Sequence, residues 1–84
     1  MTPDELITII RANAGDPDGG RLDHADMDLA FDELGYDSIQ LLEIAAHIER
    51  ELHIPLSDTA VAETRTMREL LGLIDAATAD RPVR

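Results

Sequence analysis

The stretch YDSIQLLEIAAHIEREL, residues 36–52, decides the fold of this 84-residue chain. Its aliphatic residues recur at intervals that place them on one side of an α-helix, with polar residues between them. The predicted buried face consists of Leu41, Ile44, Ala45, Ile48 and Leu52. Such an amphipathic helix has to pack its apolar side against other elements, so the stretch predicts a main helix of a small bundle.

Both ends of this helix carry recognisable signals. Asp37 and Gln40, three residues apart, form the pattern of a capping box at the start. Pro55 lies beyond the predicted end near Leu52. With Asp37 as the capping residue, Ser38 becomes the first residue of the helix, and its hydroxyl is expected to face outward.

A second apolar patch lies on the same helix, at roughly 100–160° from Leu41 around the axis. It comprises Ile39, Leu42 and Ala46, and its border comprises Glu43, Glu49, Arg50 and His53. One interpretation is that the patch packs beneath a loop or a short helix, as in many small bundles. The other is an exposed apolar surface bordered by acids, which is typical of a protein-docking site.

The N-terminal segment predicts a helix over residues 3–14. Thr2 and Glu5 form a capping box, and Pro3 suits the first helical turn. The apolar residues at helical spacing are Leu6, Ile9, Ile10 and Ala14. Gly15 supplies the stop signal.

A long connection follows, over residues 15–36. The sequence GDPDGG at 15–20 cannot continue a helix, and a loop of this length in a compact domain is usually functional. The apolar residues expected to hold it against the core are Leu22, Met27, Leu29, Phe31 and Leu34. The acidic segment DPDGGRLD invites comparison with a calcium-binding loop, but Arg21 stands where that loop requires glycine and Met27 where it requires glutamate.

The C-terminal third predicts two further helices. IPLS at 54–57 indicates a turn and residues 59–63 a short helix, while Thr66 and Glu69 form a capping box for a helix ending near Ala77. The buried stripe of that helix is Met67, Leu70, Leu71 and Ile74. The whole chain is therefore predicted to be all-α: a small antiparallel bundle of three main helices plus one short helix. We expect one domain over residues 1–84, with a frayed tail at about 79–84.

The charge of the chain restricts its partners. Asp and Glu number 18, Lys and Arg number 7, and the net charge is −11. Nucleic-acid binding depends on basic surfaces, so it is excluded, and an anionic membrane would repel the chain. A basic protein partner would be attracted, although the acidity could also serve solubility alone.

The chain contains no cysteine, so it has no disulfide and no thiolate nucleophile or metal ligand. Its first ten residues include Asp4 and Glu5 and lack the basic start of a signal peptide. No apolar run reaches the length of a membrane span. We expect a cytoplasmic protein.

Catalysis by Ser38 would require a base within reach. His24 lies in the acidic loop, His47 points away from Ser38, and His53 lies about 22 Å down the same helix; no GxSxG motif is present. A phosphate ester on this serine, in contrast, would lie at the positive end of the helix dipole. The position therefore suits covalent attachment of a phosphoryl-linked group.

At this point the sequence resembles a known family. LGYDSIQLLE, residues 34–43, resembles the attachment motif of acyl carrier proteins: Ser38 matches the modified serine, Asp37 the preceding acid, and Ile39 the usual leucine. The resemblance extends over nearly the whole chain, through IPLSD and TRTMREL. The LGYDS sequence, the acidic loop and the ending RTMRELLGLI look most like the discrete carriers of type II (aromatic) polyketide synthases.

The resemblance implies a non-catalytic carrier subunit for polyketide, and thus antibiotic, biosynthesis. A phosphopantetheinyl transferase would move 4′-phosphopantetheine from coenzyme A to Ser38, and the thiol of that arm would hold malonyl and growing polyketide units as thioesters. The implied partners are a ketosynthase with its chain-length factor, a malonyl transferase, and a ketoreductase or cyclase. Neither nucleic acid nor membrane is a partner, and we expect a monomer.

The resemblance also implies roles for individual residues. Asp37, Glu43 and Glu49 match acids that contact partner enzymes. Ile39 is shared between the attachment motif and the apolar patch, where Leu42 and Ala46 match apolar contact positions; Arg50 departs from the pattern, since carriers often have an acid there. A cleft for part of the acyl chain would be lined by Leu34, Leu42, Ala46, Val61 and Met67, although each is explained equally well as core.

Two other functions remain open at this stage. One is a carrier for fatty-acid synthesis. The other, from a different class, is an unmodified acidic interaction bundle in which Ser38 merely caps a helix. Tyr36 fits the polyketide-type pattern, but the sequence offers no physical reason for a tyrosine at this position.

Overall fold

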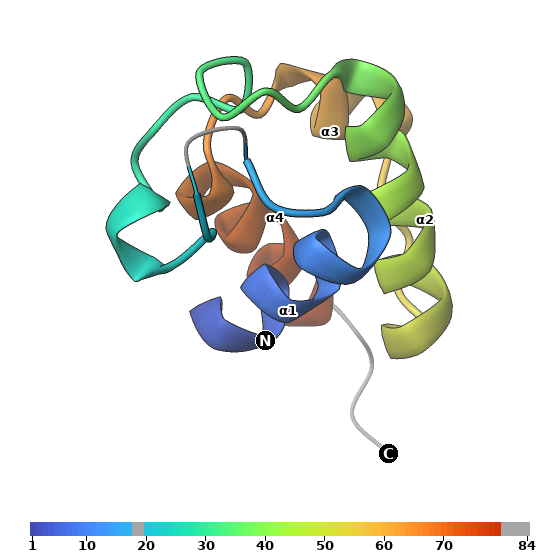
Figure 1. Cartoon of the computed structure of the whole chain (residues 1–84). Coiled ribbons are helices and arrows are strands. Elements are labelled where there is room, and N and C mark those ends of the chain that lie inside the picture. The colour runs from blue at the N-terminus through green and yellow to red at the C-terminus, as the bar shows by residue number, and fades with distance from the viewer. Residues whose placement is uncertain (18–19, 80–84) are drawn as a thin grey trace.

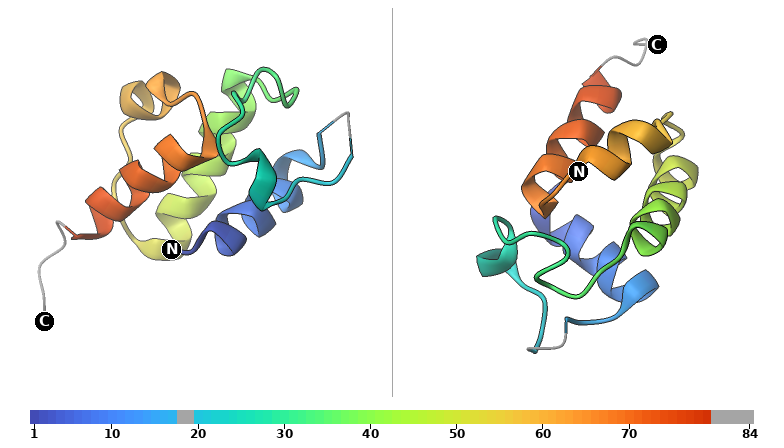
Figure 2. Two further views of the ribbon diagram at one scale, coloured as in Figure 1. Left: turned by 90° about the vertical axis from the view of Figure 1, so that its left-hand side faces the viewer. Right: turned by 90° about the horizontal axis from the view of Figure 1, so that it is seen from above.

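The computed structural model describes residues 1–17 and 20–79, and in this part of the chain it is all-α (Figure 1). The elements are α1 (Pro3–Ala14), the 3₁₀ helix η1 (His24–Asp26), α2 (Ser38–Leu52), α3 (Asp58–Glu63) and α4 (Met67–Ala79). No strand occurs within the described ranges, where one isolated antiparallel bridge joins Ala30 to Thr66. Figure 2 (left) shows α1 running opposite to α2. The predicted fold class and the order of the four α-helices are confirmed; η1 was not predicted.

The helix starts follow the local signals in the sequence. The Thr2 hydroxyl accepts a hydrogen bond from the Glu5 N–H at 3.2 Å, and the Glu5 carboxylate accepts one from the Thr2 N–H at 2.9 Å. At the other end of α1, Gly15 adopts a φ of +78° and donates its N–H to the Arg11 carbonyl. α3 begins at Asp58, one residue earlier than predicted, because Ser57 caps it.

The start of α4 departs from its prediction in one bond. The Thr66 hydroxyl accepts the Glu69 N–H at 3.1 Å, as a capping box requires. The Glu69 carboxylate, however, accepts the N–H of Arg65 and not that of Thr66. The chain enters α4 directly from the bridge at Thr66, which sets the backbone direction there. α4 also continues to Ala79, so the first residue of the predicted frayed tail is helical; residues 80–84 lie outside the described part of the chain.

A single cluster of apolar side chains forms the core. On α2 the buried face is Leu41, Ile44, Ala45 and Ile48, as predicted, while Leu52 is only partly buried. On α4 it is Met67, Leu70 and Ile74, with Leu71 only partly buried. On α1 it is Leu6, Ile7 and Ile10. The predicted Ile9 and Ala14 are only partly buried, and Ile7 takes their place, because α1 is covered by η1 as well as by α2 and α4.

The long connection lies against the bundle and is hydrogen-bonded to the start of α4. Its buried side chains are Leu22, Met27, Phe31, Leu34 and Tyr36. The predicted contribution of Leu29 to the core is wrong: this side chain is 41% exposed, because the surrounding chain covers it only in part. The Phe31 N–H donates to the Arg65 carbonyl at 2.7 Å, and the Arg68 N–H donates to the Met27 carbonyl at 3.2 Å. Figure 2 (right) shows the connection crossing from the α4 side to the start of α2.

Candidate functional site

Ser38 is the first residue of α2, and its neighbours perform the capping. The Asp37 carboxylate accepts the Gln40 N–H at 2.8 Å, and the Gln40 side-chain oxygen accepts the Asp37 N–H at 2.9 Å. The Ser38 side chain is exposed and takes no part in either bond. Its hydroxyl is therefore accessible at the N-terminus of a 15-residue helix, as the capping pattern predicted.

The histidines do not form a catalytic arrangement with Ser38. His24 Nε2 lies 2.6 Å from an Asp4 carboxylate oxygen, and His47 Nε2 lies 3.6 Å from a Glu51 carboxylate oxygen one turn along α2. His53 is the C-cap residue at the opposite end of the same helix, with a φ of +54°. His24 and His47 each lie beside a carboxylate and His53 lies at the far end of α2, so none of the three is placed as a general base for Ser38.

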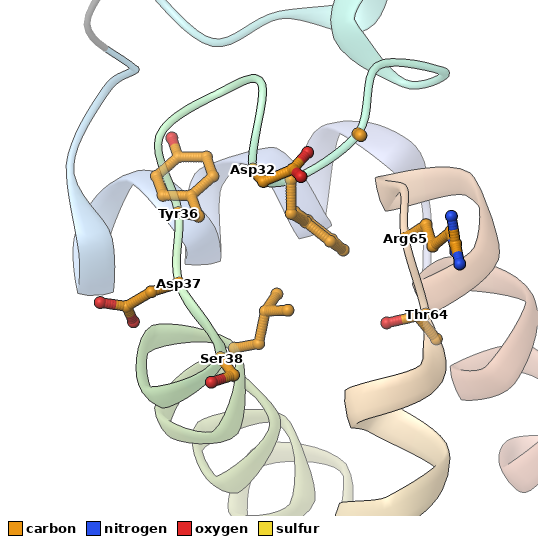
Figure 3. A pocket seen from close by; sticks show the side chains of 9 residues that line it. Asp32, Tyr36, Asp37, Ser38, Thr64 and Arg65 are labelled. Atoms are coloured by element: carbon orange, nitrogen blue, oxygen red, sulfur yellow. The ribbon is translucent and has the colours of Figure 1, made fainter.

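A surface pocket of about 510 Å³ adjoins Ser38 (Figure 3). Its lining residues are Ala30, Phe31, Asp32, Tyr36, Asp37, Ser38, Leu41, Thr64 and Arg65. The bridge between Ala30 and Thr66 brings the two sides of this pocket together, because it holds the long connection beside the segment that links α3 to α4. In Figure 3 the Arg65 guanidinium points away from Ser38, whereas the Thr64 hydroxyl faces the pocket.

This pocket is not the cleft that was predicted for an acyl chain. None of Leu34, Leu42, Ala46, Val61 and Met67 lines it. Val61 and Met67 are completely buried, because the packing of α3 and α4 encloses them in the core. Asp32, Thr64 and Arg65 were not predicted as neighbours of the site. Thr64 and Arg65 reach it from a distant segment, and Asp32 reaches it through the turn of the connection just before Ser38, so no local pattern marks them.

An ion pair joins the long connection to α4 through Asp28 and Arg68. The Arg68 guanidinium donates to both carboxylate oxygens of Asp28, at 2.6 and 3.2 Å. The hydrogen bond from Arg68, with its positive charge, lowers the pKa of the Asp28 carboxyl, and Asp28 in turn raises the pKa of Arg68. Both groups are exposed, so solvent screens the pair. Together with the backbone bonds at Met27 and Phe31, it fixes the connection to α4.

The second apolar patch of α2 divides between the two interpretations. Ile39 is 67% exposed, whereas Leu42 and Ala46 are partly buried and Leu42 packs against the core. Glu43 is exposed and Glu49 half-buried. The surface beside Ser38 thus presents most of the Ile39 side chain, together with the exposed Glu43 and the partly buried Leu42 and Ala46.

Tyr36, which the sequence left unexplained, is almost completely buried. Its side chain is part of the core, and its hydroxyl donates a 2.7 Å hydrogen bond to the carbonyl oxygen of Gly15 at the end of α1. Burial raises the pKa of this hydroxyl, and the nearby charges of Asp16 and Asp26 raise it further. A tyrosine suits this position because it combines a core-filling ring with a donor for a distant carbonyl group.

Comparison with known proteins places this geometry in a family. The family described as "Phosphopantetheine attachment site" matches residues 4–74. The granaticin polyketide synthase acyl carrier protein of Streptomyces violaceoruber is 46% identical over 95% of this chain and 94% of its own length. The tetracenomycin polyketide synthase acyl carrier protein of Streptomyces glaucescens is 43% identical over 88% of this chain and 86% of its own length.

Solved structures agree with the sequence matches. The actinorhodin holo acyl carrier protein of Streptomyces coelicolor superposes with a TM-score of 0.84 at 36% identity, covering 98% of this chain and 95% of that one. The same protein carrying a 3,5-dioxohexyl triketide mimic superposes with a TM-score of 0.86, over the same shares of both chains. The likeness therefore extends over the whole helical fold.

A helical chain that matches the phosphopantetheine attachment family over residues 4–74 belongs to the class of phosphopantetheine-carrying proteins, and this one presents an exposed serine at the start of α2. The chain belongs to the acyl carrier protein family, in the group that serves polyketide synthases. Its cofactor is 4′-phosphopantetheine, and it is a carrier subunit of polyketide synthase enzymes and not a catalyst. The expectation drawn from the resemblance is confirmed at this level. None of the helices in the described ranges has the length and hydropathy of a membrane-spanning segment.

Proposed function

We propose that the phosphopantetheine arm is attached to Ser38 and that this chain presents malonyl and growing polyketide units on it. The observation that carries the proposal is the accessible Ser38 hydroxyl, which Asp37 and Gln40 leave free by capping α2 between themselves. The residues around Ser38 fit the group: the helix N-terminus favours a phosphate, and the adjoining pocket offers space beside the attachment point.

The chain's own part in the modification is small. The Ser38 oxygen attacks the phosphorus of coenzyme A that carries the pantetheine; a new phosphodiester bond forms, adenosine 3′,5′-bisphosphate leaves, and the serine proton passes to a base of the transferase. Once attached, the arm supplies a terminal thiol that holds acyl groups as thioesters. Asp37 caps the start of α2, and the positive end of that helix would favour the negative charge of a phosphodiester on Ser38.

The surface beside Ser38 supports docking of partner enzymes through α2. Ile39 supplies an exposed apolar contact, with Leu42 and Ala46 behind it, and Glu43 and Glu49 supply negative charge. Basic surfaces on a phosphopantetheinyl transferase, malonyl transferase, ketosynthase with its chain-length factor, or ketoreductase or cyclase would be attracted to it. We further propose that residues 1–84 act as one monomeric carrier domain in the cytoplasm.

Intact-mass spectrometry tests the attachment site. The chain is incubated with coenzyme A, magnesium and a broad-specificity phosphopantetheinyl transferase. We expect a mass gain of one phosphopantetheine in the wild type and none in Ser38→Ala. The matched control is Ser57→Ala, which changes an exposed serine at the cap of α3 and should still gain the group. Modification of Ser38→Ala, or no modification of the wild type by a transferase active on another carrier, would refute the proposal and favour the unmodified interaction bundle.

A further inference from the structure

We propose that Tyr36 is a positioning residue for the modification of Ser38, because it ties the start of α2 to the end of α1 through the carbonyl of Gly15. This inference rests on the proposed attachment at Ser38. The inference gives a role to Tyr36, for which the sequence offered no physical reason. Tyr36 takes no part in the capping bonds between Asp37 and Gln40.

Tyr36 is held by two hydrogen bonds, one from its side chain and one from its backbone. Its hydroxyl donates to Gly15 at 2.7 Å, and its own N–H donates to the Phe31 carbonyl at 3.0 Å. The side chain is only 5% exposed and is enclosed in the core. The residue two positions before Ser38 therefore has little freedom, although Asp37 and Ser38 themselves are exposed.

The acceptor of the hydroxyl bond is itself fixed to α1. Gly15 donates its N–H to the Arg11 carbonyl at 3.0 Å. The next residue, Asp16, accepts hydrogen bonds from the Arg11 guanidinium at 2.7 Å and from the Leu22 N–H at 3.2 Å. The bond from Tyr36 thus ends on a turn that is already connected to both the helix and the long connection.

The direction of the side chain separates positioning from chemistry. Figure 3 shows the Tyr36 hydroxyl pointing away from Ser38, while the ring borders the same pocket. The hydroxyl therefore cannot assist the attack of Ser38 and acts only through the backbone that leads into α2. Phenylalanine would fill the same space in the core without making the bond, so Tyr36→Phe isolates the contribution of the tie.

The first measurement uses the unmodified protein. Amide hydrogen exchange is compared in the wild type and Tyr36→Phe at Tyr36 and at Leu41, whose N–H donates to Asp37 in the first turn of α2. We expect the protection factors of these amides to fall about threefold to tenfold, which corresponds to the net free energy of one hydrogen bond. The protection factors of amides in α4 should change less. Asp37→Ala, which removes the cap, serves as a positive control for loosening at this turn.

The second measurement follows phosphopantetheine transfer by a broad-specificity transferase. We expect Tyr36→Phe to raise KM by up to about tenfold with little change in kcat, because a turn that Tyr36 no longer orders has to be ordered when the transferase binds. The matched control is Ile74→Val, a change at a fully buried residue of α4 that lowers stability away from Ser38 and should leave KM unchanged.

The role of Tyr36 and the attachment at Ser38 are contradicted by different results. Unchanged protection at Tyr36 and Leu41 in Tyr36→Phe, or an equal rise of KM in Ile74→Val, would overturn the positioning role of Tyr36. Absence of transfer to the wild type would instead overturn the attachment at Ser38, whatever hydrogen exchange shows for Tyr36.

Discussion

The two faces of α2 differ in almost every property. The inner face, formed by Leu41, Ile44, Ala45 and Ile48, is at most 6% exposed and lies in the core. The outer face begins with the accessible Ser38, continues with the exposed Ile39, and is bordered by acids. One face of α2 therefore packs in the core, and the other presents Ser38, the proposed attachment site. Changes on the two faces should therefore affect different observables, stability on the first and carrier function on the second.

The largest expected effect is on the inner face. Ile48→Ala removes a completely buried side chain and should lower the free energy of unfolding by roughly 2–5 kcal/mol. Ile39→Ala, the matched change on the outer face, should change it by no more than about 0.5 kcal/mol. Urea denaturation of both variants measures the difference. Equal losses in the two variants would contradict the division between the faces.

Charge reversal on the outer face should affect function instead. The double variant Glu43→Lys, Glu49→Lys should lower the catalytic efficiency of ketosynthase-dependent chain extension by up to about tenfold at low salt, because it removes attraction to basic partners. Glu51→Lys, on the same helix beside His47, is the control and should have little effect. Kinetics with holo protein at two salt concentrations test this. An equal loss in the control would show that net charge matters and the docking face does not.

Asp37, the cap of α2, lies at the start of the helix, where the inner and outer faces both begin. Its loss should lower stability by less than a change in the core does. Asp37→Ala removes the acceptor for the Gln40 N–H and should lower the free energy of unfolding by about 1 kcal/mol. Asp37→Asn retains a side-chain acceptor and should retain most of the stability. Thermal denaturation compares the two variants. If both lost the same stability, charge at the helix start and not the capping bond would be responsible.

The smallest expected effect concerns pH. Burial raises the pKa of Tyr36 above its usual value of 10.0, so the folded protein keeps this proton to higher pH than the unfolded chain does. Its stabilising contribution is therefore complete below about pH 10 and is lost as pH rises through the raised value. Tyr36→Phe should lack this alkaline loss. Because Tyr36 is the only tyrosine, tyrosinate absorbance follows the titration directly, and a wild-type loss shared by the variant would assign it to other groups.

Local patterns account for most of what could be predicted about the fold. The capping boxes at Thr2 and Asp37 each involve residues three apart, and both form as expected. The exposure of Ser38 follows from the second of them. Leu29 was placed wrongly, since spacing alone does not say how many neighbours cover an element, and this loop residue is left 41% exposed. Ile9 does pack against the core but is only partly buried, while Ile7, which was not predicted, is buried on a helix covered from several directions.

The sequence by itself determined the helices, the acidic charge and the free hydroxyl of Ser38, because helix periodicity and capping bonds act within a few residues. Only the tertiary structure decided what lies around that serine. Thr64 and Arg65 reach the pocket through the bridge between Ala30 and Thr66. Tyr36 acquires its role through a carbonyl group 21 residues away. Contacts of this kind depend on how separate segments pack in three dimensions, and no pattern within one segment records them.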